Sequence, residues 1–224
     1  MLSLLRRIRP PAVSVDLRRG VTRCLTNFSE RGTQFELATV DTLQQSKFQL
    51  TQTGGANDGG IDFQGVWQLE PFASIPVIGQ CKHTASPVGV EVIRDFDGAT
   101  NAYLGSTISQ RSLSSTSSGS EATTTTTMST QHPLVGIIVS ASTFTKNARR
   151  LSSHLDQPQL LVSMTENEKE FDTEARLNWE VVSVIPNRAF LRHFPQIGFT
   201  RLDPEGGTDT RCAFYYDDGK LVWM

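Results

Sequence analysis

Three short segments with few charged residues place the strongest limit on the fold of this chain. They span residues 75–82, 134–142 and 159–164 and read IPVIGQCK, LVGIIVSAS and QLLVSM. Apolar runs of this length are typical of strands that are buried on both faces of a sheet. Segments with helical periodicity separate them, at 89–103 and 144–154. This alternation predicts an α/β fold around one mixed sheet.

The flanking residues extend this pattern in both directions. A helix at 33–45 and strands at 47–53 and 61–69 are expected before the first buried strand. Residues 31–187 then form one domain with an α-β-β-β-α-β core. Residues 188–224 are expected to be a small β-rich extension of that domain, and this extension ends in a hairpin.

The start of the chain differs in charge from the rest. Residues 1–31 hold seven arginines against two acidic residues, a net charge of +5, and because the whole chain carries −2 the remainder carries −7. Arginine-rich, acid-poor sequence with an apolar stripe is typical of mitochondrial transit peptides. Residues 1–30 therefore predict import into the mitochondrial matrix, with a basic, anion-binding tail as the alternative. No apolar run is long enough to span a membrane.

Two further features bear on folding and on the chemistry that the chain excludes. Residues 106–130 contain 17 serines or threonines in 25 positions, so they are expected to be a disordered insertion within the domain. Cys24, Cys81 and Cys212 show no metal-ligand spacing and are too far apart for a disulfide scaffold. The cysteines thus indicate a reducing compartment.

The candidate chemistry lies in two consecutive strands. Gln80 and Lys82 are two residues apart, so they project from the same face of a strand, roughly 7 Å apart. Asp62 belongs to the preceding strand, after a glycine-rich turn. If these strands pair with their faces matched, a carboxylate, an amide and an ammonium group meet at one end of the sheet. Oxygen ligands beside a lysine suit Mg²⁺ and a metal-bound water.

The same residues resemble a known family. The resemblance rests on GTQFEL at 32–37, LTQTGGANDGGIDFQG at 50–65, GQCK at 79–82 and VIRDFDGA at 92–99. In this combination the chain resembles the Mrr-type branch of the PD-(D/E)xK nuclease superfamily, and within it the fungal mitochondrial proteins required for respiratory growth.

The resemblance implies a restriction endonuclease-like fold and a Mg²⁺-dependent endonuclease of mitochondrial genome maintenance. It implies that Glu36 and Asp62 are acidic metal ligands, that Gln80 replaces the usual second acid and that Lys82 is the catalytic lysine. The implied substrate is nucleic acid, with DNA favoured over RNA. Cleavage of both strands would need two such sites, as in a homodimer.

Each of these residues also has an interpretation without catalysis. Thr33 and Glu36 fit a helix capping box, and Asp62 and Lys82 fit ordinary strand positions. Glycines at 54, 55, 59 and 60 simply suit a tight turn, in which Asp58 is a weaker candidate ligand. The alternative function is a catalytically silent nucleic-acid or protein binding module on the same fold.

Two other observations limit the functional hypotheses. Cys81 and His83 share a strand face, but no acid is placed to orient a nucleophile pair. The acidic body argues against a strong DNA binder, although local basic patches could supply a contact surface. These patches consist of Lys146, Arg149 and Arg150, or of Arg188 and Arg192.

Overall fold

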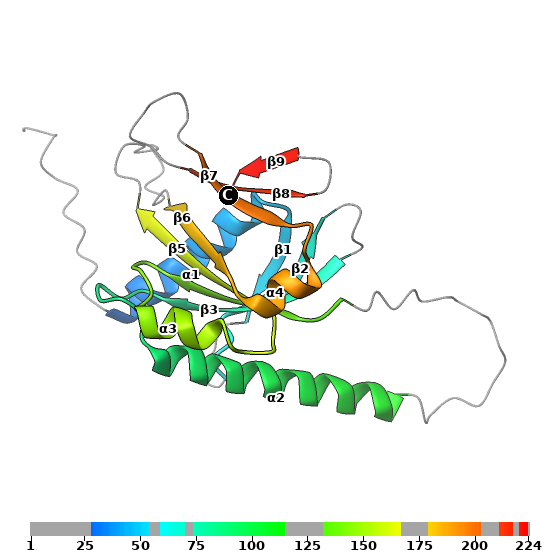
Figure 1. Cartoon of the computed structure of the whole chain (residues 1–224). Coiled ribbons are helices and arrows are strands. Elements are labelled where there is room, and N and C mark those ends of the chain that lie inside the picture. Colours follow the sequence, from blue (N-terminus) through cyan, green and yellow to red (C-terminus); the bar gives the residue numbers. More distant parts are fainter. Residues whose placement is uncertain are drawn as a thin grey trace, which may run out of the picture.

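A six-stranded mixed sheet forms the centre of the fold in this computed structural model (Figure 1). The structure describes residues 28–53, 59–69, 74–114, 132–166, 179–202, 211–216 and 220–223. Residues 1–27 of the predicted transit peptide and most of the predicted disordered insertion therefore lie outside the described residues. No helix among the described residues is long and apolar enough to cross a membrane.

The strands follow one another across the central sheet in chain order. They are β1 (Phe48–Gln52), β2 (Phe63–Gln68), β3 (Ser74–Lys82), β4 (Val135–Ser140), β5 (Gln159–Glu166) and β6 (Trp179–Pro186). Strands β3, β4 and β5 are parallel to one another, and the remaining neighbours are antiparallel. The predicted α/β class with one mixed sheet is thus confirmed.

Helices and a second, smaller sheet surround this centre. The helices are α1 (Phe28–Gln44), α2 (Val90–Ser114), α3 (Lys146–Ser152) and α4 (Arg188–His193). The second sheet is antiparallel and contains β7 (Gly198–Leu202), β8 (Arg211–Tyr216) and β9 (Lys220–Trp223). It confirms the β-rich extension, and the β8–β9 pair is the expected hairpin.

The central sheet has a hydrophobic cluster on each face. On one face, Phe35 of α1 packs with Phe63 and Trp67 of β2. On the other, Phe96 of α2 packs with Ile78 of β3 and with side chains of α3. All six residues of β4 are buried, as expected for a strand covered on both faces. Figure 1 shows α2 and α3 on one side of the sheet and the second sheet on the opposite side.

Three features of the secondary structure differ from those expected. Helix α1 begins at Phe28, well before the predicted start. Helix α2 continues to Ser114, so residues 106–114 of the predicted disordered segment are helical; the hydroxyls of Ser106 and Thr107 bond to the carbonyl of Tyr103 in the preceding turn. The third difference is α4, which lies in the extension predicted to be β-rich.

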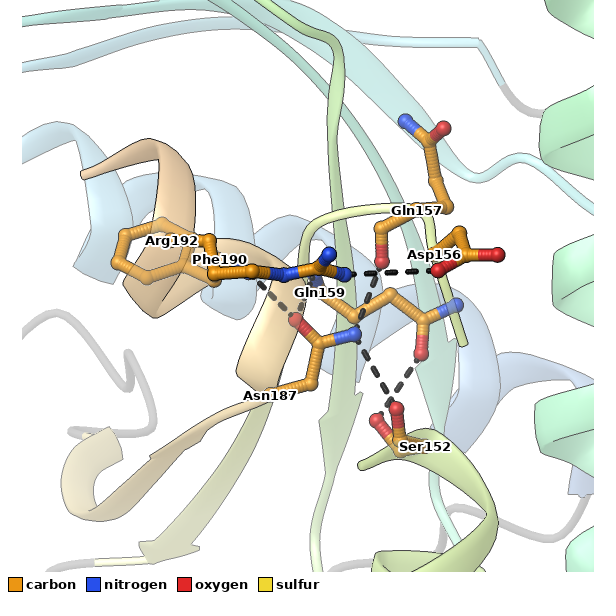
Figure 2. A network of polar contacts seen from close by, with 7 residues as sticks. All are labelled: Ser152, Asp156, Gln157, Gln159, Asn187, Phe190 and Arg192. Carbon is orange, nitrogen blue, oxygen red and sulfur yellow. Dashed lines mark hydrogen bonds and ion pairs between the residues drawn. The ribbon is translucent and has the colours of Figure 1, made fainter. Parts of the chain in front are cut away.

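Helix α4 forms because Asn187 caps it and ties it to neighbouring elements (Figure 2). Its Oδ1 accepts from the backbone N–H of Phe190 at 2.8 Å and from that of Gln159 at 3.0 Å. Its Nδ2 donates to the carbonyls of Ser152 at 3.1 Å and of Gln157 at 2.8 Å. One buried amide thus joins the start of α4 to the end of α3 and the start of β5. A helix of this length gives too little periodicity for sequence analysis to detect.

We expect Asn187→Ala to lower the free energy of unfolding by about 2–4 kcal/mol, because it removes a cap and leaves several buried backbone groups without a partner. Thr145→Ala is the matched control: Thr145 caps α3 through a single bond to the N–H of Ala148 at 3.1 Å, and its loss should cost about 1 kcal/mol. Urea denaturation measures both. Equal losses would show that Asn187 acts as an ordinary cap.

Candidate functional site

Asp62 is held between β1 and β3, immediately before β2. Its N–H donates to the carbonyl of Gly79 at 2.8 Å, and its own carbonyl accepts from the N–H of Thr53 at 2.9 Å. The carboxylate oxygen Oδ2 accepts from the backbone N–H of Cys81 at 2.6 Å. Because both its backbone and its side chain are bonded to neighbouring strands, the carboxylate has a fixed position at this end of the sheet.

Gln80 lies opposite Asp62 on the adjacent strand. The antiparallel register pairs Phe63 with Gly79, so the next residues along, Asp62 and Gln80, share one face. Gln80 is buried, and its Oε1 has no hydrogen-bond partner among the described residues. An unpaired acceptor is costly in a buried position, which makes this oxygen a candidate ligand.

Gly60, the last glycine of the glycine-rich turn, lies against the side chain of Gln80. Gly60 has a φ of +83°, and a Cβ at this position would lie 3.1 Å from Nε2 of Gln80. Gly59 also has a positive φ, at 64°, so both glycines adopt the conformation expected of the turn. Gly54, Gly55 and Asp58 lie outside the described residues.

Lys82 ends β3 on the same face as Gln80. It is half-buried, and its Cα pairs with that of Ser140 at the end of β4. The Ser140 hydroxyl lies 3.1 Å from that of Ser142. The carboxyl ends of β3 and β4 therefore bring Lys82 next to the buried Ser140.

Glu36 reaches this end of the sheet from α1. Because α1 begins at Phe28, Glu36 lies in the helix interior, and the capping box with Thr33 is wrong. Its Oε2 accepts from Nε2 of Gln52, the last residue of β1, at 3.0 Å. Glu36 thus lies in the α1 layer, whereas Gln80 and Lys82 project from the opposite face of the sheet.

Cys81 lies between these groups on the α1 side of β3. Burial raises the pKa of the Cys81 thiol, and the negative charges of Asp62 and Glu36 add to this effect, whereas Lys82 opposes it. His83 is exposed, with its ring 5.4 Å from that of Phe35. A buried thiol that stays protonated is a poor nucleophile, so the geometry argues against a Cys81–His83 pair.

The described residues contain no group of three or more His, Cys, Asp or Glu side chains placed to hold a metal ion. The oxygen atoms that could ligate a metal near this end of the sheet come instead from two carboxylates and one amide, those of Glu36, Asp62 and Gln80. Sequence analysis missed Gln52, which orients Glu36. Its contact depends on how α1 packs against the sheet, and no local pattern carries that information.

Comparisons with known proteins point to a respiratory-growth family. A family model described as "Required for respiratory growth protein 7" matches residues 27–76. This stretch contains Glu36 and Asp62 and ends before Gln80 and Lys82. An uncharacterized mitochondrial protein of Schizosaccharomyces pombe is 31% identical over 80 residues, which is 35% of this chain and 32% of the relative. The matched part thus spans about a third of that relative's length.

No solved structure matches the chain. The two matches support the predicted resemblance to the respiratory-growth family, and they bear out the mitochondrial location expected from residues 1–30. Neither match is to a protein described as an Mrr-type nuclease.

The position of Cys81 predicts low thiol reactivity. Because burial raises the pKa of its thiol, the reactive thiolate forms only above the usual pH range. We expect iodoacetamide to leave Cys81 unmodified in the folded protein at mildly alkaline pH, and to modify it fully in urea. Peptide mass spectrometry measures both. Equally fast labelling in the two states would contradict the buried position.

Proposed function

We propose that the protein is a metal-dependent, nuclease-like hydrolase that cleaves phosphodiester bonds of mitochondrial DNA and so supports genome maintenance and respiratory growth. The observation that carries this proposal is the buried, unpaired Oε1 of Gln80 opposite the fixed carboxylate of Asp62. Lys82 lies two residues further along the same face. The proposal includes a restriction endonuclease-like core, because the element order agrees with that arrangement.

The residues at this end of the sheet fit a divalent cation. Asp62 and Gln80 would hold it from one face of the sheet, and Glu36 would have to reach it from the α1 layer around the strand ends. All three offer the oxygen atoms that Mg²⁺ prefers. A bound Mg²⁺ supplies a water of lowered pKa and neutralises charge on the phosphate. The unpaired Oε1 of Gln80 supports this assignment, because a ligand would satisfy an acceptor that no described residue satisfies.

Lys82 would contact the substrate and would not be a metal ligand. Its ammonium group can donate hydrogen bonds to the attacking water and to a phosphate oxygen, and its charge offsets the negative charge that builds up during attack. Asp62 is fixed by the Cys81 N–H, so it needs little reorganisation to hold its position. Double-strand cleavage would require two copies of this site, so a homodimer remains a prediction.

The location and physiological role rest on the relatives. The matching family is named for respiratory growth, and the related protein of S. pombe is named mitochondrial. A hydrolase acting on DNA in mitochondria would connect these names to the candidate site, because respiration depends on genes kept in that compartment.

Three substitutions test the proposed site. Lys82→Ala should lower cleavage of a DNA duplex by about 10² to 10³ while leaving Mg²⁺ binding intact, since the lysine is not a ligand. Asp62→Ala should lose metal binding and activity together. Glu36→Gln keeps an acceptor for Gln52 but removes a negative charge, so it should weaken metal binding. Gel-based cleavage assays and calorimetric Mg²⁺ titration measure these effects.

The matched control for these substitutions is Arg94→Ala, which removes an exposed cation of α2 and should leave cleavage unchanged. If the unmodified protein binds DNA but cleaves no duplex at any Mg²⁺ concentration, the catalytic proposal is wrong and the silent binding module is favoured. If Lys82→Ala and Asp62→Ala both cleave normally, the site is elsewhere.

The location predicts that residues 1–31, fused to a fluorescent reporter, direct it into mitochondria, because arginine-rich sequence without acids favours import. Replacing the seven arginines of this segment by glutamine should abolish import. Microscopy and protease protection of isolated mitochondria measure the outcome. A cytosolic reporter would contradict the transit-peptide prediction.

A further inference from the structure

Two short helices carry exposed cations on their outward faces. In α3, Lys146, Arg149 and Arg150 follow the i, i+3, i+4 spacing of one helix face, and all three are exposed. In α4, Arg188 and Arg192 are also exposed and stand four residues apart. Residues 146–157 and 187–193 hold these five cations and one acidic residue, Asp156. The protein beyond residue 31 is otherwise acidic.

This placement favours the helices only in part, because Arg149, Arg150 and Arg192 lie in the last turns, where the helix dipole favours positive charge. Lys146 is the first residue of α3 and Arg188 the first of α4, where the helix dipole disfavours positive charge. Lys146 and Arg150, and likewise Arg188 and Arg192, form like-charged i, i+4 pairs, which also destabilise a helix. Among the described residues, Asp156 pairs with Arg192 at 3.4 Å between fully or largely exposed side chains. Such a pair contributes little.

The two helices are held in a fixed relative position. Asn187 caps α4 and also donates to the carbonyl of Ser152, the last residue of α3 (Figure 2). Arg192 reaches the loop after α3 through Asp156. Buried side chains of α3 and α4 belong to the clusters on opposite faces of the central sheet, so the two helices meet around the end of the sheet at which β5 begins. We call their five exposed cations, Lys146, Arg149, Arg150, Arg188 and Arg192, the α3–α4 basic surface.

This surface begins near the proposed site and leads away from it. The chain leaves β4 beside the end of β3, where the N–H of Ala141 donates to the carbonyl of Lys82 at 3.1 Å. It reaches the start of α3 beside Val88, because the N–H groups of Val88 and Thr145 bond to the carbonyls of Thr143 and Val88 at 2.8 and 3.0 Å. The end of α3 lies at the start of β5, where the Ser152 hydroxyl donates to the Gln159 side chain at 3.1 Å. Helix α3 has seven residues, so it runs roughly 10 Å between these two places.

We propose that the α3–α4 basic surface binds the phosphate backbone of a nucleic acid duplex beyond the stretch that is cleaved. The inference rests on the proposed function for its ligand class. Clustered arginines and lysines neutralise phosphates without reading sequence. A membrane-binding helix would need an apolar face as well, and Leu191 is the one exposed large apolar side chain described on these two helices.

The test uses the full chain and a fluorescently labelled DNA duplex of arbitrary sequence, with EDTA present so that no cleavage occurs. Arg188→Gln/Arg192→Gln removes two cations of the surface. Arg31→Gln/Arg94→Gln is the matched control, because it removes two exposed arginines from α1 and α2. Every variant keeps the arginines of residues 1–30, so their contribution to binding is the same.

Anisotropy titrations over a range of salt concentrations give the slope of log affinity against log salt. The α4 double variant should lower this slope by about two units, and a Lys146→Gln/Arg149→Gln/Arg150→Gln variant by about three, because each lost phosphate contact lowers it by about one. The control should keep the slope of the unmodified protein. Arg188→Lys/Arg192→Lys should also keep it, since the charge is retained.

Three results would overturn the inference. The first is an α4 double variant with the salt slope of its control. The second is a triple variant of α3 that binds like the unmodified protein. The third is an α4 double variant or α3 triple variant that binds vesicles of phosphatidylcholine and cardiolipin less well than the unmodified protein but binds the duplex equally well. That result would assign the surface to a membrane. Failure of the proposed function looks different: the duplex binds in EDTA but is not cleaved when Mg²⁺ is added.

Discussion

The burial of the central strands on both faces determines where polar chemistry can occur in this protein. Strand β4 exposes none of its residues, so helices must cover both sides of the sheet. The strand ends are then the places where polar side chains can reach solvent while the backbone stays hydrogen-bonded. Asp62, Gln80 and Lys82 all lie at one such end, and the rigidity of their positions comes from the strands rather than from loops.

Sequence analysis predicted the strands and their order because the apolar runs at 75–82, 134–142 and 159–164 carry strong local signals. It left open whether Asp62 and Gln80 share a face, and the antiparallel register of β2 and β3 answers that question. Sequence analysis failed where contacts between distant parts of the chain determine the local structure. The alternative of a capping box at Thr33 and Glu36 is wrong because α1 begins at Phe28, and α4 depends on contacts of Asn187 with distant residues.

The neutral side chain at position 80 has an electrostatic consequence for any cation at this edge. An amide oxygen ligates a hard cation but adds no negative charge, so Asp62 and Glu36 would supply all of the formal neutralisation. Because Glu36 approaches from the α1 layer and is already bonded to Gln52, the two carboxylates are not equivalent. Occupancy would therefore respond to the substrate, whose phosphate brings the missing charge.

The length of α2 has a consequence for local stability. Its 25 residues extend ~37 Å at 1.5 Å per residue, about twice the length of β4 beneath it, and Figure 1 shows the helix continuing beyond the sheet. The Tyr103 hydroxyl donates to Gln64 of β2 at 3.0 Å, whereas Gly105 and Ser106 are exposed. Amide hydrogen exchange should thus be graded along one continuous helix: the first half opens only with the whole domain, and the second half opens by fraying.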